Sequence, residues 1–211
     1  MASNTGKNSG PLHESTVAVH GGEFVDPATR ASSPNLVMSA TFAPTDVTGF
    51  SARDEKDYDG FVYGRVSSPT VRQLEQKLAA LEGAEAALAY ASGVAASHAL
   101  IAGRLSKGDH LLMPDSNYVG VAELTRDTLH RFGLEASFVD TTDATAVAAE
   151  TRPNTRMLWL ETSSNHTMQI TDVRMLAALA HEKGVRHELV DSTYATPIAT
   201  QPFSLSLIHI C

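Results

Sequence analysis

The sequence has a single cysteine, Cys211, and no apolar run long enough to cross a bilayer as a helix. One cysteine excludes a disulfide framework or a cysteine-based metal site within one chain, and it fits a reducing compartment. The first 14 residues are polar and lack the apolar stretch of a secretory signal. These absences predict a cytoplasmic protein with no membrane partner.

Positive charge is also scarce, with 16 Lys and Arg against 24 Asp and Glu and a formal net charge of -8. This balance disfavours nucleic acid and anionic lipid as partners. The nine histidines show no metal-ligand spacing, so no metal site is predicted. No Walker loop, Gly-x-Ser-x-Gly elbow or Gly-x-Gly-x-x-Gly turn is present, which disfavours P-loop enzymes, serine hydrolases and Rossmann dehydrogenases.

Apolar residues are plentiful, at 43% of 211, and support a sizeable core. From residue 16 to residue 63 they form short pieces interrupted by prolines at positions 27, 34 and 44 and by a charged run over residues 53–59, which predicts an irregular N-terminal arm. Beyond Pro69, apolar runs alternate with helical patterns. This alternation predicts an α/β domain with a mainly parallel sheet and helices on both faces. The predicted strands are residues 86–91, 110–113, 136–139, 157–160 and 188–190, and the predicted helices are residues 70–82, 93–104, 121–131, 144–149 and 173–183.

Three polar clusters follow predicted strands, at Ser92-Gly93, Glu161 to Asn165 and Asp191 to Thr193. Ligands of open α/β sheets bind at the carboxyl ends of the strands. The backbone N–H groups of Ser92-Gly93-Val94 open a helix and are suited to hold a phosphate, although an ordinary strand-to-helix turn has the same sequence.

Two further candidates carry charge. Tyr63 and Arg65 share one face of an extended segment and are suited to clamp a phosphate; a solvated turn is the alternative. Asp191 ends an apolar strand, where a buried carboxylate needs a cation such as a protonated pyridinium nitrogen; capping of the next turn is the alternative.

Tyr118 and Asn165 complete the candidate set. The Tyr118 ring is suited to stack on an aromatic cofactor, and packing at an interface is its alternative role. The Asn165 amide is suited to donate to a phenolate oxygen, or else it stabilises its own turn.

These pieces occur in a recognisable order. The segments YGRVSSPT with LEQKLAALEGAEAALAYASGVAA, ETSSNHTMQITDV and VDSTYATP resemble motifs of the cysteine/methionine (transsulfuration) family of pyridoxal-phosphate enzymes, as do TVAVHGG and SATF. The resemblance covers about residues 16–203. It implies an aspartate-aminotransferase-like large domain (fold type I) that is incomplete at the C-terminus, with arm residues 1–62, cofactor-binding residues 63–203 and a tail, residues 204–211, unlike the family.

The resemblance implies that Gly93 and Val94, with Ser92 beside them, bind the phosphate of pyridoxal 5'-phosphate. It also implies that Tyr63 and Arg65 reach the phosphate of a neighbouring subunit. A homo-oligomer follows, with a dimer as the smallest complete unit and a dimer of dimers in a full-length protein.

The catalytic residues implied by the resemblance are Tyr118, which stacks on the ring and moves protons, and Asp191, which keeps the ring nitrogen protonated. Asn165 approaches the ring hydroxyl and the substrate carboxylate, and Thr193 is a further cofactor-binding residue. The implied chemistry is β- or γ-elimination or replacement on a sulfur amino acid or an activated homoserine.

The sequence departs from the family pattern at Ser68, Ser163 and His166, which replace an asparagine and two prolines, and at Val94, often methionine in the family. The larger departure is the Schiff-base lysine, which the family carries beyond the aspartate strand and which is absent here. The chain as written is therefore predicted to be inactive. A non-catalytic domain that binds a phosphate cofactor is the alternative.

Overall fold

The computed structural model describes residues 12–23, 25–43, 60–205 and 207–210. The predicted charged run over residues 53–59, most of the polar N-terminus and Cys211 lie outside these residues. The chain forms two compact units, Met1–Leu88 and Ala89–Cys211. The predicted division into an arm (residues 1–62), a cofactor-binding domain (residues 63–203) and a tail (residues 204–211) stays a prediction.

The first unit contains helices α1 (Glu14–His20) and α2 (Pro69–Glu82). The predicted start and end of α2 are confirmed. The Ser68 hydroxyl accepts a hydrogen bond from the Val71 N–H (3.3 Å), and Pro69 occupies the first turn. Gly83 ends the helix with φ 64°, in the left-handed region that glycine adopts without steric cost.

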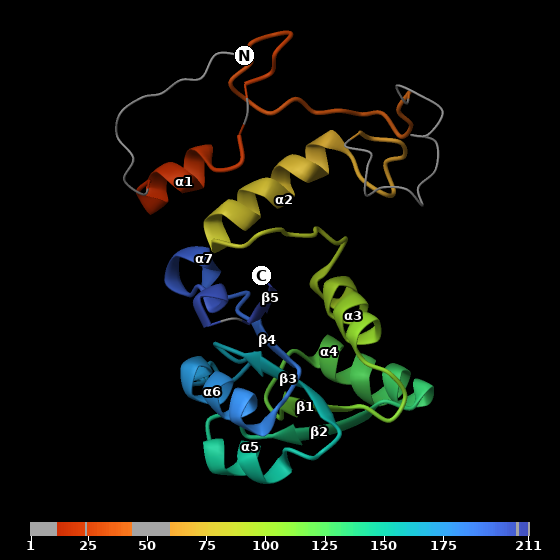
Figure 1. Ribbon diagram of the computed structural model, residues 1–211, viewed down its shortest axis with the longest axis vertical. Coiled ribbons are helices and arrows are strands. Elements are labelled where there is room, and N and C mark those ends of the chain that lie inside the picture. The colour runs from red at the N-terminus through yellow and green to blue at the C-terminus, as the bar shows by residue number, and fades with distance from the viewer. Residues whose placement is uncertain (1–11, 24, 44–59, 206, 211) are drawn as a thin grey trace. The chain divides into compact units, whose positions relative to one another are not determined.

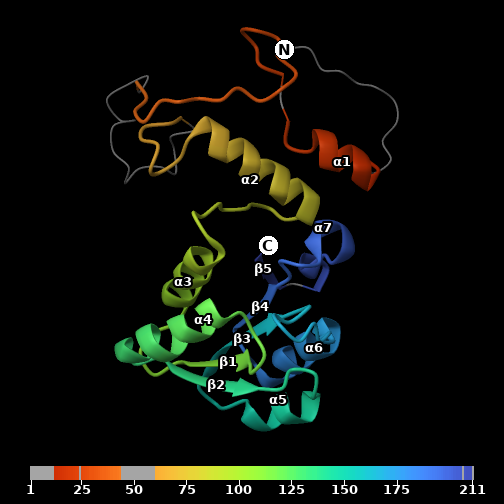
Figure 2. The same cartoon turned by 180° about the vertical axis from the view of Figure 1, so that it is seen from behind.

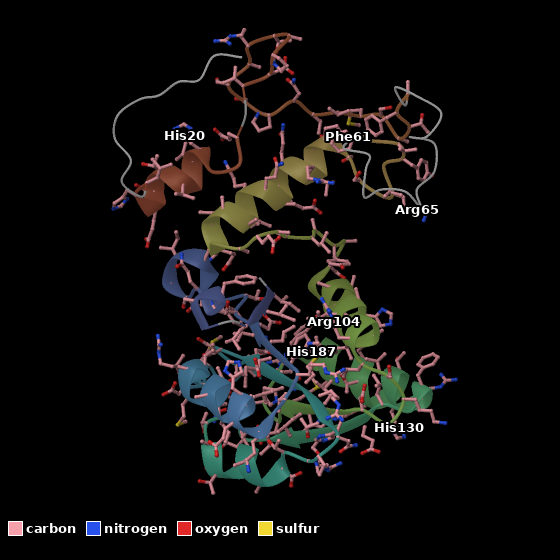
Figure 3. The ribbon with its side chains drawn as sticks, viewed as in Figure 1. His20, Phe61, Arg65, Arg104, His130 and His187 are labelled. Carbon is pink, nitrogen blue, oxygen red and sulfur yellow. The ribbon has the colours of Figure 1, made fainter. Side chains whose placement is uncertain are left out.

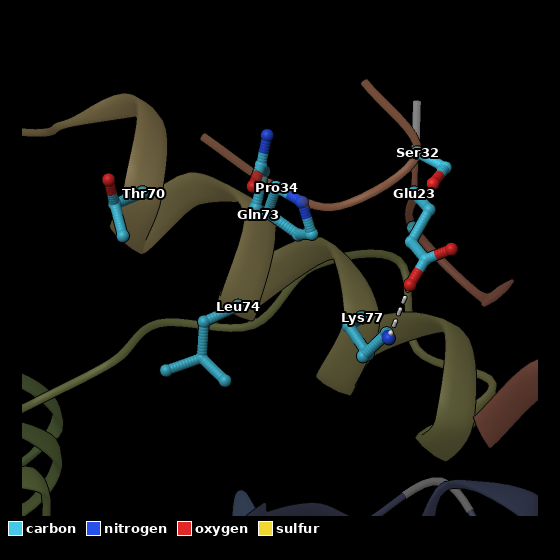
Figure 4. Close-up of a pocket in the computed structure, with 8 residues that line it drawn as sticks. Glu23, Ser32, Pro34, Thr70, Gln73, Leu74 and Lys77 are labelled. Carbon is cyan, nitrogen blue, oxygen red and sulfur yellow. Dashed lines mark hydrogen bonds and ion pairs between the residues drawn. The ribbon is translucent and has the colours of Figure 1, made fainter. Parts of the chain in front are cut away.

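Polar contacts join α1 and the segment after it to α2. Lys77 Nζ donates to the Val19 carbonyl (2.8 Å) and forms an ion pair with Glu23 (3.0 Å). Gly22 lies so close to α2 that a Cβ added to it would lie 2.6 Å from the backbone nitrogen of Lys77. A cavity of about 210 Å³ lies beside these contacts (Figure 4).

The second unit is a five-stranded sheet in the order β2-β1-β3-β4-β5, and every pair of neighbouring strands is parallel. The predicted parallel α/β architecture is therefore confirmed. The strands are β1 (His110–Pro114), β2 (Glu135–Val139), β3 (Thr155–Glu161), β4 (His187–Asp191) and β5 (Ile208–Ile210). The helices are α3 (Gly93–Arg104), α4 (Val119–Glu123), η2 (Leu124–Thr128), η3 (Leu129–Phe132), α5 (Ala144–Glu150), α6 (Val173–Lys183), α7 (Thr196–Ala199) and η4 (Pro202–Leu205).

Helices cover both faces of this sheet, with α3 and α4 on one face and α5 and α6 on the other (Figures 1 and 2). Successive strand residues point to opposite faces, so each strand supplies both layers of the core. One layer contains Ile101, Leu111, Met113, Val121, Met157, Trp159 and Leu189. The other contains Leu112, Val147, Leu158, Leu160, Leu176, Ala180 and Val190.

The prediction of a strand over residues 86–91 is wrong. These residues form neither helix nor strand, and the division of the chain into two units falls within them, between Leu88 and Ala89. The apolar pattern predicted burial, yet Leu88 is 73% and Tyr90 47% exposed. A strand needs a partner to hydrogen-bond, and local composition does not supply one. β5, which no apolar pattern had predicted, pairs with β4 instead.

His110 makes the stability of this unit dependent on pH. Its ring is fully buried at the start of β1, and Nδ1 lies 2.7 Å from the Thr155 hydroxyl. Burial, helped by the Arg152 charge, lowers the pKa of His110 below its usual value. The stability from this neutral ring is present above the unfolded-state pKa of about 6.5 and is lost as the pH falls through the lower folded-state pKa.

We therefore expect the wild-type free energy of unfolding to fall relative to that of His110→Gln as the pH drops from 7.5 to 5. The difference should change by up to about 1.4 kcal/mol for each pH unit. Urea unfolding of both proteins across this range measures it. Equal pH dependence in the two proteins would contradict the assignment.

Candidate functional site

The carboxyl ends of β3 and β4 lie side by side, because Glu161 and Asp191 are paired in register. The loops that follow these strands carry Asn165 and Thr193. The sheet therefore brings two of the predicted polar clusters, Glu161 to Asn165 and Asp191 to Thr193, to the same end of the strands, the carboxyl edge of the sheet. Parallel neighbouring strands are expected to do so.

Asp191 is half-buried at this edge. Its Oδ1 accepts hydrogen bonds from the Thr193 N–H (3.1 Å) and from the Thr193 hydroxyl (2.6 Å). Asp191 thus caps the turn that follows β4, which was the alternative role predicted for it. The same two hydrogen bonds from Thr193 also orient the carboxylate. A carboxylate held at a strand end suits a protonated ring nitrogen.

Glu161, which sequence reasoning did not single out, is the best-buried acid at this edge, with 5% exposure. Its Oε2 accepts the Tyr118 N–H (2.9 Å) and its Oε1 accepts the Asn165 N–H (2.6 Å). Burial raises the pKa of Glu161, the two N–H donors lower it, and the nearby Asp191 charge raises it further. The only sequence signal was a charged residue at the end of the apolar run over residues 157–160.

The loop after β3 is held by its own polar groups. The Ser164 N–H donates to the Gln169 carbonyl (3.0 Å), and the Thr162–Ser163 peptide bond is cis. Asn165 Nδ2 donates to the Tyr194 hydroxyl (3.2 Å), a contact that joins this loop to the loop after β4. A cavity of about 450 Å³ opens beside the loop, lined by Asp115, Ser116, Asn117, Asp140, Asn165, His166, Thr167 and Gln169.

Tyr118 immediately precedes α4, with a half-exposed ring. An added Cβ on Gly120 would lie 2.8 Å from Tyr118 Cε1 and 3.2 Å from Val94 Cγ2. Both side chains therefore approach the same point. The fold thus places the start of α3 beside Tyr118, although 24 residues of sequence separate Val94 from it.

The start of α3 has the donors that a phosphate needs. Ser92 accepts the Ala95 N–H on its hydroxyl (3.1 Å) and the Ala96 N–H on its carbonyl (3.1 Å). The first-turn N–H groups of Gly93 and Val94 have no acceptor within the helix. Apart from its chain neighbours and the backbone of its own helix, no atom of the described residues lies within 4 Å of a Cβ built on Gly93, so this approach is open. The residues present fit a phosphate group.

Tyr63 and Arg65 belong to the first unit. Tyr63 forms an isolated antiparallel bridge with Thr41, and Arg65 Cζ lies 5.5 Å from the centre of the Tyr63 ring. Both side chains are exposed, and Figure 3 labels Arg65. The two side chains approach each other, but their action on the cofactor of a neighbouring subunit stays a prediction.

Within the described part of the chain, no three His, Cys, Asp or Glu side chains are placed to hold a metal ion. In the same residues, no helix combines the length and the apolar character needed to span a membrane.

The parallel α/β fold and the polar residues at the carboxyl ends of β3 and β4 are those expected of the cofactor domain of a pyridoxal-phosphate enzyme. The family model of Cys/Met metabolism PLP-dependent enzymes matches residues 15–209, and the chain belongs to this family. The predicted family, fold class and cofactor are therefore confirmed.

Similar proteins include canavanine gamma-lyase of Pseudomonas canavaninivorans, 39% identical over 90% of this chain and 47% of its own length. Cystathionine gamma-synthase of Mycobacterium tuberculosis is 36% identical over 93% of this chain and 48% of its own length. The crystal structure of cystathionine gamma-lyase from Lactobacillus plantarum, complexed with L-serine, is 32% identical and superposes with a TM-score of 0.84, over 93% of this chain and 49% of that one. The chain spans about half the length of these relatives.

Proposed function

We propose that this chain forms part of the cofactor site of an enzyme that catalyses β- or γ-elimination or replacement on a sulfur amino acid or an activated homoserine. The observation that carries the proposal is the carboxyl edge of the sheet. There, Asp191 and the loop that carries Asn165 follow adjacent strands. Lyases and synthases are both found among the relatives, so the family supports this reaction class as a whole.

Each residue of the candidate site has a distinct task in this proposal. The N–H groups of Gly93 and Val94 hold the phosphate, and the Tyr118 ring covers one face of the pyridine. Asp191 holds the proton on the ring nitrogen, and Asn165 orients the ring hydroxyl. Bound pyridoxal phosphate supplies an electron sink for the amino acid's α-carbon.

The arm completes the proposal. Tyr63 and Arg65 bind the phosphate held by a neighbouring copy, which makes a homo-oligomer the working unit. The guanidinium suits this task because it stays charged and forms paired hydrogen bonds to phosphate oxygens.

Asp191→Ala is expected to weaken the binding of pyridoxal phosphate by about 10- to 100-fold. The substitution removes a hydrogen bond between charged groups, which contributes roughly 1.5–3 kcal/mol. Quenching of Trp159 fluorescence during cofactor titration measures the affinity. Trp159 is the single tryptophan and lies buried on β3, beside β4.

Asp143→Ala is the control. Asp143 lies in the loop after β2, outside the lining of the cavity beside Asn165, and its Oδ1 accepts the Thr145 N–H (2.8 Å) and the Ala146 N–H (3.3 Å). Both substitutions therefore remove a carboxylate that accepts two local hydrogen bonds in a loop after a strand. An equal loss of cofactor affinity in the two variants would refute the ring-nitrogen role of Asp191.

A further inference from the structure

Glu161 connects two segments that are distant in the sequence. It ends β3, and its two carboxylate oxygens bind different backbone N–H groups, one at Tyr118 before α4 and one at Asn165 in the following loop. Tyr118 lies 43 residues away in the sequence. A single buried side chain thus holds the backbone of two residues whose own side chains belong to the candidate site.

The geometry of these contacts is strict. Each oxygen accepts one N–H, at 2.9 Å for Tyr118 and 2.6 Å for Asn165, and charge-assisted hydrogen bonds of this length are strong. The side chain is attached to a central strand of the sheet, which is more rigid than either loop. Loops that are tied to a rigid strand hold their side chains in fewer orientations.

We propose that Glu161 is a positioning residue, whose carboxylate holds the Tyr118 and Asn165 backbones in place so that their side chains are oriented for the cofactor. Only the tasks of those two side chains rest on the proposed function. The connection itself rests on the hydrogen bonds. Glu161 touches neither cofactor nor substrate in this proposal.

A general structural role is the competing explanation, because removal of any buried carboxylate can loosen a fold. Glu188 offers a matched control. It is 6% exposed on the adjacent strand β4, and burial raises its pKa as well. Its Oε2 pairs with His181 (3.0 Å) on α6, away from the carboxyl edge.

The test compares Glu161→Gln with Glu188→Gln by amide hydrogen exchange of the 211-residue chain. The glutamine nitrogen cannot accept a hydrogen bond, so one of the two N–H groups loses its acceptor. We expect exchange in peptides around residues 116–120 or 163–167 to quicken about tenfold in Glu161→Gln and less than twofold in Glu188→Gln. Equal changes in the two variants, or none at residues 116–120 and 163–167 in Glu161→Gln, would overturn the proposal.

A second variant keeps the test decisive. If circular dichroism shows that Glu161→Gln is unfolded, Glu161→Asp replaces it. This variant keeps the charge but is one methylene shorter, so it can reach only one of the two N–H groups. The same local increase in exchange is expected, and uniform exchange across the chain would count against positioning.

Cofactor titration by Trp159 fluorescence separates this inference from the proposed function. We expect Glu161→Gln to bind pyridoxal phosphate about tenfold more weakly than Glu188→Gln does. If the wild type binds the cofactor but local exchange in Glu161→Gln is unchanged, the positioning role alone is refuted. If the wild type binds no cofactor but local exchange in Glu161→Gln is faster, the proposed function is refuted. The role of Glu161 in holding the Tyr118 and Asn165 backbones would then still stand.

Discussion

Leu160→Ala is expected to lower the free energy of unfolding by about 2–5 kcal/mol. Leu160 is fully buried on the central strand β3, in the layer that packs against α5 and α6. Removing its side chain loses the transfer free energy of the buried carbons. It also leaves a cavity, because strands on both sides prevent the neighbours from closing in. Denaturant unfolding followed by circular dichroism measures the change.

Met175→Ala is the control for this prediction. Met175 lies on α6 next to the buried Leu176, but its own side chain is 43% exposed. An exposed substitution away from special features changes the stability by about 0.5 kcal/mol or less. Comparable losses in Leu160→Ala and Met175→Ala would mean that the layer between β3 and α6 is not closely packed.

The 211-residue chain is expected to turn over cystathionine no faster than free pyridoxal phosphate does. A positioned general base contributes about 10²–10⁴-fold, and the family's lysine, which would serve as that base, does not follow Asp191 in this sequence. Two lysines of the second unit are described, and both lie near the amino ends of strands. Lys107 precedes β1, and Lys183 ends α6 before β4. The candidate site lies at the opposite edge.

Purified chain incubated with pyridoxal phosphate and reduced with borohydride tests this prediction. Mass spectrometry then locates any pyridoxyl-labelled lysine, while a parallel assay follows loss of cystathionine. Cofactor binding without turnover or a specific label would favour a non-catalytic binding domain for the chain by itself. Turnover above the free cofactor, with one lysine labelled, would refute the prediction.

Four strands were predictable from their apolar runs. Parallel strands that are buried on both faces, as β1 and β3 are, read as continuous apolar sequence. The runs at residues 110–113 and 157–160 became β1 and β3 within one or two residues. The run at residues 86–91 looks the same in sequence, yet it has no place in the sheet. Its apolar character was a real signal, but a partner strand is a property of the whole fold.

The candidate site was likewise predictable from the sequence only in part. Asp191 was predictable, because a single acid at the end of an apolar strand stands out against its neighbours. Glu161 occupies the equivalent place on β3 and was predicted only as the first residue of a polar cluster, without a role of its own. Its significance depends on the hydrogen bond from the Tyr118 N–H, and that contact exists only once α4 has packed on its face of the sheet.

The sequence by itself determined the elements whose causes are local. Ser68 and Gly83 set the two ends of α2 through contacts within a few residues, and the apolar runs predicted strands. Only the tertiary structure decided the strand order, the meeting of Val94 with Tyr118 and the two bonds of Glu161. Local hydrogen bonds and backbone preferences act between near neighbours in the chain. Contacts across many residues depend instead on how complete helices and strands pack, which no short segment encodes.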